Sequence, residues 1–296
     1  MPAANIDPPL QLLTPTPPQP QRPLFIFLPG MDGTGQLLRT QLSGLSQGFD
    51  IRCLALSVQN NWPWPQLVDQ TLQLLRPMIQ AVPRPAVYLC GESFGGCLAL
   101  QLATHAPELF SHLVLVNPAS SFHRLPWMQW GASFSQWLPG PLYRVSNMGL
   151  MPFLIQQRRV TAAAREALWE SMTAVPASTA LWRVALLGQF KAQQLPLEHM
   201  PRPTLLIAGE ADALLPSVAE VRQLGRRLPD AQILTLPESG HACLLERDVN
   251  LYALMADAGF LEPMARAAAS SDSLTNDSLY SNEGSKDNNQ FVTSGS

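Results

Sequence analysis

The chain has 296 residues, of which 46% are hydrophobic, and its formal net charge is −3. This length and apolar content suit one large α/β domain that buries a sizeable core and has flexible ends. The slight acidity, without any block of lysine and arginine, disfavours nucleic acid and anionic membrane surfaces as partners.

The chain is expected to begin with an extended, partly disordered lead-in over residues 1–22, because prolines fix φ and remove backbone donors there. The folded domain is expected over residues 23–265, followed by a disordered tail over residues 266–296 that has few apolar side chains. Nearly continuous apolar runs predict buried parallel strands at Leu24–Leu28, Ile51–Leu56, Ala86–Cys90, Leu113–Val116, Thr204–Ala208 and Gln232–Leu236. Helical patterns lie at Trp64–Gln80, Phe94–Thr104, Ser217–Leu228 and about Asp248–Ala258. This alternation predicts α/β architecture with a mostly parallel, doubly wound sheet.

The regular alternation stops between Val116 and Thr204, over a length too great for one crossover helix. This interval holds five of the seven tryptophans, so we interpret residues 121–198 as an inserted helical cap. Trp127, Trp130 and His123 are the candidates for contact with substrate. The alternative for these aromatic residues is that they only pack the cap onto the sheet.

The motif Gly91-Glu92-Ser93-Phe94-Gly95 follows an apolar strand and opens a helix. A Gly-x-Ser-x-Gly motif in this setting is typical of a sharp strand-to-helix turn that raises the serine hydroxyl above the sheet. The two glycines leave room for the turn and for close packing of the helix. We therefore predict that Ser93 is a nucleophile, whereas the alternative role is a helix N-cap.

A nucleophilic serine needs a general base, and the base needs an acid that orients it. Asp212 follows the strand that ends at Ala208, and His241 follows the strand that ends at Leu236. Both therefore lie at the carboxyl edge of the sheet and in the chain order Ser, acid, His that this fold uses. Glu210 is the nearest rival acid, and we expect it to point aside. The other four histidines are less well placed to act as the base.

The oxyanion of an acyl-transfer reaction needs backbone N–H donors close to the nucleophile. Phe94, directly after Ser93, is predicted to supply one donor, and Met31 in the loop Leu28-Pro-Gly-Met-Asp-Gly-Thr-Gly the second. Asp32 is expected to turn away from the site and to bond the glycine-rich turn. Such a triad supplies its own base, so no metal or organic cofactor is predicted.

Four cysteines occur without a Cys-x-x-Cys pair, which disfavours zinc and fits a reducing compartment. Cys243 lies two residues after His241, and we interpret it as a structural thiol. The alternative is that it approaches the site. No secretory signal and no apolar run of roughly 18 residues is present, so a cytoplasmic protein without a transmembrane segment is expected. Peripheral binding to a membrane through an apolar surface is an alternative that the sequence leaves open. The sequence does not indicate an oligomeric state.

From about Pro23 to Phe260 the chain resembles the α/β-hydrolase superfamily. The loop over residues 28–35 and the turn Gly91-Glu-Ser-Phe-Gly-Gly96 resemble the esterase/lipase/thioesterase group of cyanobacteria and plastids, which includes the hydrolase part of phytyl ester synthases. The resemblance implies acyl chemistry on lipid-like esters and a photosynthetic source. Plant members add an acyltransferase-like domain with a His-x₄-Asp motif, which this sequence lacks.

The leading hypothesis is a serine hydrolase that cleaves a hydrophobic carboxylic ester or thioester through an acyl-enzyme. A second hypothesis is an acyltransferase that makes fatty acyl or phytyl esters, because an alcohol can replace water in the second half-reaction. The third is a hydrolase-like binding protein without turnover. Relatives with an aspartate nucleophile are disfavoured, because Ser93 holds that position.

Overall fold

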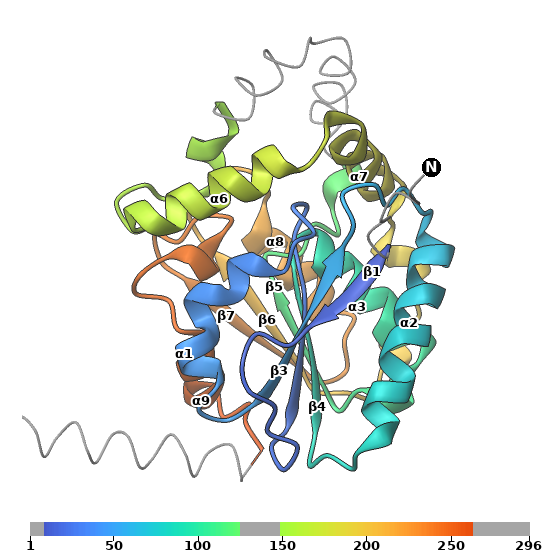
Figure 1. The fold of residues 1–296 in the computed structure, drawn as a ribbon. Coiled ribbons are helices and arrows are strands. Elements are labelled where there is room, and N and C mark those ends of the chain that lie inside the picture. Colours follow the sequence, from blue (N-terminus) through green and yellow to red (C-terminus); the bar gives the residue numbers. More distant parts are fainter. Residues whose placement is uncertain (1–8, 125–148, 263–296) are drawn as a thin grey trace, which may run out of the picture.

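The computed structural model describes residues 9–124 and 149–262, and it is built on a seven-stranded sheet with the order β1-β3-β2-β4-β5-β6-β7 (Figure 1). The strands are β1 (Leu10–Leu13), β2 (Leu24–Leu28), β3 (Asp50–Leu56), β4 (Val87–Glu92), β5 (His112–Val116), β6 (Thr204–Gly209) and β7 (Ala231–Leu236). All neighbouring strands from β3 to β7 pair in parallel, and β1 pairs with β3 in the antiparallel direction. The sheet confirms the predicted α/β-hydrolase architecture.

Strand β1 was not predicted, because the proline-rich lead-in indicated only extended chain. Leu10 pairs with Leu56 and Leu13 with Cys53, and Leu10 and Leu12 pack against the core. An edge strand of four residues is compatible with the prolines on either side of it, since only one of its edges donates to a neighbour. The lead-in therefore extends the sheet beyond β3.

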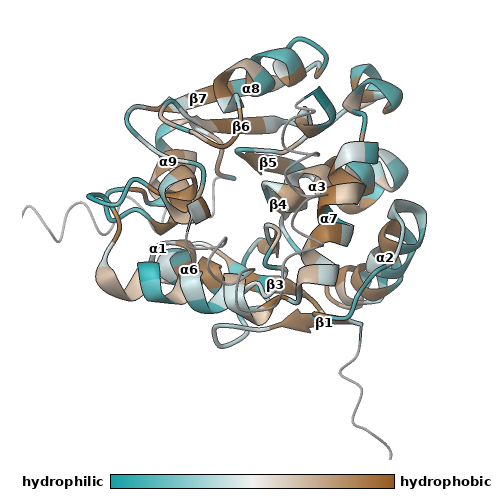
Figure 2. Ribbon diagram, turned by 90° about the horizontal axis from the view of Figure 1, so that it is seen from above, coloured by the Kyte–Doolittle hydropathy of each residue, from teal (hydrophilic) through white to brown (hydrophobic). Residues whose placement is uncertain are grey.

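The core has two parts, one on each face of the sheet. Leu24, Ile26 and Leu28 face α2 (Trp64–Ala81) and α3 (Phe94–His105), whereas Phe25 and Phe27 lie in the cluster on the side of α9 (Leu251–Asp257). All five of these β2 side chains are fully buried or nearly so. Figure 2 shows the apolar strands between helices on both sides. Burial on both faces explains why the strands are continuous apolar runs.

The predicted helices are present, with shifts of a few residues at their ends. Helix α8 (Ser217–Gly225) ends three residues before the predicted end at Leu228, and α9 begins at Leu251 rather than near Asp248. The side chain of Asn250 accepts a hydrogen bond from the N–H of Ala253 and so caps α9 at its first turn. A short helix, α1 (Leu42–Leu45), precedes β3 and lies near α9.

The segment between β5 and β6 contains helices and no strand of the sheet among its described residues. It includes a short turn of 3₁₀ helix at Phe122–Arg124, a helical stretch at residues 149–154, α6 (Ala162–Ala174) and α7 (Ala177–Gln189). In Figure 1, α6 and α7 lie at the top of the view, over one end of the sheet. Within the described part of the chain, none of the helices has the length and apolarity needed to span a bilayer.

Candidate active site

The candidate site lies at the carboxyl edge of the sheet, where five neighbouring loops follow parallel strands. Ser93 directly follows β4, Asn117 follows β5, Asp212 comes after β6, and His241 comes after β7. The loop after β2 passes against Ser93, because a Cβ atom added to Gly30 would lie 3.8 Å from the Cβ of Ser93. Parallel pairing brings all these strand ends to one edge.

Ser93 occupies a strained turn between β4 and α3. Its φ is 53° and its ψ is −112°, a conformation that non-glycine residues rarely adopt. The turn is crowded: a Cβ on Gly91 would lie 2.3 Å from the carbonyl oxygen of Gly95, and a Cβ on Gly95 would lie 2.1 Å from that of Leu28. Glycine at both positions therefore allows the helix to begin directly against the strands, which is the geometry that the motif predicted.

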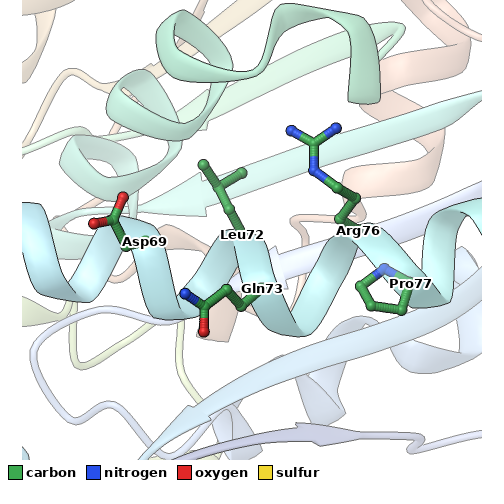
Figure 3. Close-up of a pocket in the computed structure, with 5 residues that line it drawn as sticks. All are labelled: Asp69, Leu72, Gln73, Arg76 and Pro77. Carbon is green, nitrogen blue, oxygen red and sulfur yellow. The ribbon is translucent and has the colours of Figure 1, made fainter.

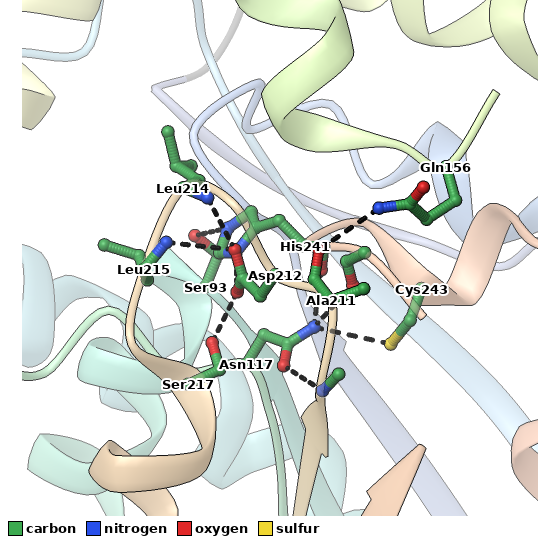
Figure 4. Close-up of polar contacts among 12 residues, drawn as sticks. Ser93, Asn117, Gln156, Ala211, Asp212, Leu214, Leu215, Ser217, His241 and Cys243 are labelled. Atoms are coloured by element: carbon green, nitrogen blue, oxygen red, sulfur yellow. Dashed lines mark hydrogen bonds and ion pairs between the residues drawn. The ribbon is translucent and has the colours of Figure 1, made fainter. Parts of the chain in front are cut away.

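A chain of hydrogen bonds joins Ser93, His241 and Asp212 (Figure 4). The Oγ of Ser93 lies 2.9 Å from His241 Nε2, and His241 Nδ1 lies 2.8 Å from Asp212 Oδ2. With the proton on Nδ1, the imidazole donates to the carboxylate and accepts from the serine hydroxyl. The side chains of His241 and Asp212 are buried. The three predicted residues thus lie together in the arrangement that activates a serine.

Asp212 is held by its own loop and by the first turn of α8. Its Oδ1 accepts hydrogen bonds from the N–H groups of Leu214 and Leu215, and its Oδ2 accepts one from the hydroxyl of Ser217. Burial raises the pKa of Asp212, but the charge of His241 and the hydrogen bonds outweigh burial and hold the pKa below its usual value. The carboxylate is therefore kept ionised beside the imidazole. The rival acid Glu210 is exposed.

The loop that carries His241 is fixed by two buried polar side chains that the sequence analysis did not single out. Asn117 donates from its Nδ2 to the carbonyl oxygens of Gly240 and His241, and its Oδ1 accepts from the N–H of Gly209. Glu246 accepts from the N–H of Gly240 and pairs with Arg159 at 2.7 Å. A signal for Asn117 was available, since it follows a predicted strand at the same edge as Ser93.

The loop after β2 is braced from within by Asp32. Its Oδ2 accepts hydrogen bonds from both the N–H and the hydroxyl of Thr34, so the carboxylate bonds the turn as expected. The carbonyl of Gly33 accepts from the N–H of Leu56 at 2.7 Å, which ties the loop to β3. Phe94 is the first residue of α3, whose first N–H groups have no acceptor within the helix. The N–H groups of Met31 and Phe94 stay the predicted oxyanion donors.

Glu92 is an ionisable group of the site that sequence reasoning did not single out. It ends β4 directly before Ser93 and is 9% exposed. Burial raises its pKa to about 7, the charge of His241 opposes this shift, and the carboxylate of Asp32 adds to it. A buried carboxyl group whose pKa is raised to about 7 therefore directly precedes Ser93 and interacts electrostatically with His241.

The remaining candidates have other surroundings or lie outside the described residues. Trp127 and Trp130 belong to the undescribed residues 125–148, so their predicted contact with substrate is not tested. His123 lies in the turn Phe122–Arg124, and its pKa is lowered by burial and by the charge of Arg124. Cys243 is fully buried, and burial raises the pKa of its thiol well above the usual value, as fits a structural cysteine.

Two hollows on the surface are lined by described residues, and neither includes a residue of the Ser93–His241–Asp212 chain. A hollow of about 310 Å³ lies on the outer face of α2, beside Asp69, Gln73 and Arg76 (Figure 3). A smaller one, of about 150 Å³, lies between α6 and the end of the loop after β2 with the residues that follow it, including Thr34 and Arg39. The second hollow is connected to the loop after β2, because its lining residue Thr34 donates a hydrogen bond to Asp32 in that loop.

Comparison with known proteins places this chain in a family. Residues 60–248 match the Hydrolase_4 family model, which is described as "Serine aminopeptidase, S33". The chain belongs to this family. It is thereby a member of the α/β-hydrolase superfamily, as the resemblance in the sequence implied.

Similar proteins include enzymes that are named for ester chemistry. Phytyl ester synthase 1, chloroplastic, from Arabidopsis thaliana is 30% identical over an alignment of 260 residues that covers 80% of this chain and 37% of that protein. The chain therefore spans about a third of that relative. A pimeloyl-[acyl-carrier protein] methyl ester esterase from Aromatoleum aromaticum is 28% identical over 80% of this chain and 98% of its own length. The solved structure of MenH from S. aureus covers 86% of this chain and 98% of its own, with a TM-score of 0.68 and 14% identity, and supports the fold.

Proposed function

We propose that this protein is a serine hydrolase that cleaves hydrophobic carboxylic esters or thioesters through an acyl-enzyme. The observation that carries the proposal is the continuous hydrogen-bonded chain from Ser93 Oγ through His241 to Asp212 at the carboxyl edge of the sheet. The names of the relatives add support for ester chemistry, because they include an ester synthase and a methyl ester esterase.

In the first half-reaction, Nε2 of His241 takes the proton of the Ser93 hydroxyl as Oγ attacks the acyl carbon. The carbonyl π electrons move onto oxygen, and the N–H groups of Met31 and Phe94 stabilise the resulting negative charge. The imidazolium then gives its proton to the alcohol or thiol as the ester bond breaks. Asp212 holds the imidazole in the required tautomer and stabilises its positive charge.

In the second half-reaction, water enters and His241 removes one of its protons. The oxygen of that water attacks the acyl carbon, and the bond to Ser93 Oγ breaks as the serine regains a proton from the imidazolium. The products are a carboxylic acid and the free enzyme. An apolar cap favours long acyl chains, because each buried CH₂ group contributes about 0.8 kcal/mol.

A fluorophosphonate probe tests the proposed chemistry directly. Wild-type protein is expected to be labelled on Ser93 and to hydrolyse p-nitrophenyl esters, whereas Ser93→Ala loses both properties. Equal labelling of wild type and Ser93→Ala would remove the proposal and leave a binding protein. In a series of p-nitrophenyl esters, kcat/KM should rise with acyl length, and a preference confined to acetate would argue against a lipid-like substrate.

Acyl transfer to an alcohol is a second candidate, and the similarity to phytyl ester synthase 1 favours it. Both reactions share the acyl-enzyme and differ only in whether water or an alcohol attacks it. Incubation with an acyl donor and phytol separates them by the ratio of ester to free acid. Ester formation that needs Ser93 supports transfer, and free acid alone supports hydrolysis.

A further inference from the structure

Arg183 of α7 is a buried cation whose guanidinium reaches out of the segment between β5 and β6 and into the loop after β2. The residue is 2% exposed. Its Nη1 donates to the carbonyl oxygen of Met31 at 2.6 Å, and its Nη2 donates to the carbonyl oxygen of Ser57 at 3.3 Å. Burial lowers the pKa of Arg183, and the carboxylate of Asp32 opposes this shift. Burial of a charged group costs free energy unless hydrogen-bond partners compensate for the lost water. The two carbonyl oxygens are such partners, so the folded structure depends on keeping them at the guanidinium.

The guanidinium lies directly against the turn of the loop. A Cβ atom on Gly33 would come within 2.6 Å of Arg183 Nη1, and Gly33 has a φ of 69°. The same turn is closed by the hydrogen bond from the N–H of Gly33 to the carbonyl of Gly30 at 3.1 Å. Arg183 therefore contacts the loop at Met31 and Gly33, the residues that flank Asp32 on either side.

The helix that carries Arg183 is itself fixed to the body of the fold. The hydroxyl of Thr179 donates to the carbonyl of Val58, and Nε1 of Trp182 donates to the carbonyl of Trp62 at 3.1 Å. Nε1 of Trp64 donates in the other direction, to the carbonyl of Leu186 at 2.8 Å. These contacts hold α7 on the segment after β3, and Arg183 is the side chain of this group that also reaches the loop after β2.

We propose that Arg183 is a positioning residue for the oxyanion site: by binding the carbonyl of Met31, it holds the N–H of Met31 toward the carbon that Ser93 attacks. The N–H of Met31 shares a peptide group with the carbonyl of Gly30, which accepts from the N–H of Gly33, and the carbonyl that Arg183 binds belongs to the next peptide group. Because Arg183 bonds this second group and also lies against Gly33, it fixes the turn whose closure holds the first group. A charge-assisted hydrogen bond to that carbonyl resists such a rotation more strongly than a neutral one. This inference rests on the function proposed above.

The test compares an ester with its thionoester, in which sulfur replaces the carbonyl oxygen. Sulfur is larger and accepts hydrogen bonds weakly, so an oxyanion site accelerates the oxygen ester far more than the thionoester. Loss of one oxyanion donor typically lowers kcat by about 10²–10³-fold. For a displaced rather than deleted donor, we expect Arg183→Gln to lower kcat for the oxygen ester roughly tenfold to a hundredfold. The rate for the thionoester should change much less. The ratio of the oxygen-ester rate to the thionoester rate should therefore fall.

Two further variants separate positioning from stability. Arg183→Lys keeps the charge but not the planar fork, and it should lower the ratio by an intermediate amount. Thr179→Val removes a hydrogen bond between the same helix and a backbone carbonyl that lies outside the loop after β2, and it should leave the ratio at the wild-type value. The two rates come from the same sample, so a smaller folded fraction cancels from their ratio.

A fallen ratio in both Arg183 variants, with an unchanged ratio in Thr179→Val, supports the inference. A wild-type ratio in the Arg183 variants overturns it, even if their total activity is low, because both rates then fall with the amount of folded protein. Failure of the proposed function has a different signature, since wild-type protein would then cleave neither ester and take no fluorophosphonate label.

Discussion

Glu92 gives the sharpest test of the electrostatics of the site, through the pH dependence of stability. Its carboxyl group is buried next to Ser93, and burial raises its pKa from an ordinary value of 4.5 to about 7. The native state therefore holds this proton more tightly than the unfolded chain does. The stability that this group contributes is fully present below about pH 4.5 and is lost as the pH rises through about 7.

The magnitude follows from the interval between the two pKa values. At 1.36 kcal/mol per pKa unit, the rise from 4.5 to about 7 corresponds to roughly 3 kcal/mol of unfolding free energy. A glutamine at position 92 is neutral at every pH and does not carry this linkage. Between about pH 4.5 and about pH 8, the free energy of unfolding of wild type should therefore fall by roughly 3 kcal/mol relative to that of Glu92→Gln.

Urea unfolding across this pH range measures the difference. Glu210→Gln is the matched control, because it removes one carboxylate from an exposed position close to the same sheet edge. Its unfolding free energy should follow that of wild type with pH, since an exposed side chain is in contact with water in both the folded and the unfolded chain. Parallel curves for wild type and Glu92→Gln would refute the reasoning, because they would mean that Glu92 binds its proton equally in both states.

Three further outcomes follow from the hydrogen bonds of the site and from the electrostatic interaction of Glu92 with His241. Asp212→Asn should lower kcat by about 10⁴-fold in p-nitrophenyl ester assays, because an amide favours the wrong imidazole tautomer, and a loss under tenfold would argue against its role. Asn117→Ala should cost about 2–3 kcal/mol in urea unfolding, because it leaves buried groups unpaired at Gly209 and in the His241 loop. Asn117 has a φ of 42°, so Asn117→Gly relieves backbone strain and should be the less destabilised; the reverse order would contradict this account. At high pH, where Glu92 is ionised, Glu92→Gln should lower kcat several-fold, on the order of 1 kcal/mol, whereas the two proteins should agree at low pH.

The centre of the sheet was readable from the sequence because strands such as β2, β4 and β6 are buried on both faces. The predicted limits Leu24–Leu28 match β2 at both ends, and the other five predicted strands differ from the structure by one or two residues at one end or, for β4, at both ends. The turn at Ser93 was readable for a related reason, since two glycines and a serine between an apolar strand and a helix favour a single local geometry. In both cases, the residues that determine the structure are neighbours in the chain.

The supports of the site were not readable, because their partners are distant in the chain. Asn117 bonds residues that follow it by more than 90 positions, and Arg183 bonds Met31 across 152 positions. An arginine in a helical pattern indicates a solvated face, and only the fold shows that Arg183 is buried. Strand β1 was missed because an edge strand of four half-buried residues has too short an apolar pattern to be distinguished from extended chain. The predicted contacts of Trp127 and Trp130 fall outside the described residues and stay predictions.

The segment between β5 and β6 is more than a cover over the site, because it braces two of the site's loops from outside. Arg159 pairs with Glu246, which bonds the loop of His241, and Arg183 bonds the loop of Met31. Each of these loops also has an internal brace, through Glu246 in the first and Asp32 in the second. Internal braces set the shape of a loop, but only contacts from outside set its place relative to Ser93. This segment therefore contributes to the preorganisation that we propose for His241 as the base and for the N–H of Met31 as an oxyanion donor. A cap taken from a relative should support activity here only if it presents a cation to the carbonyl of Met31 and a second one to Glu246.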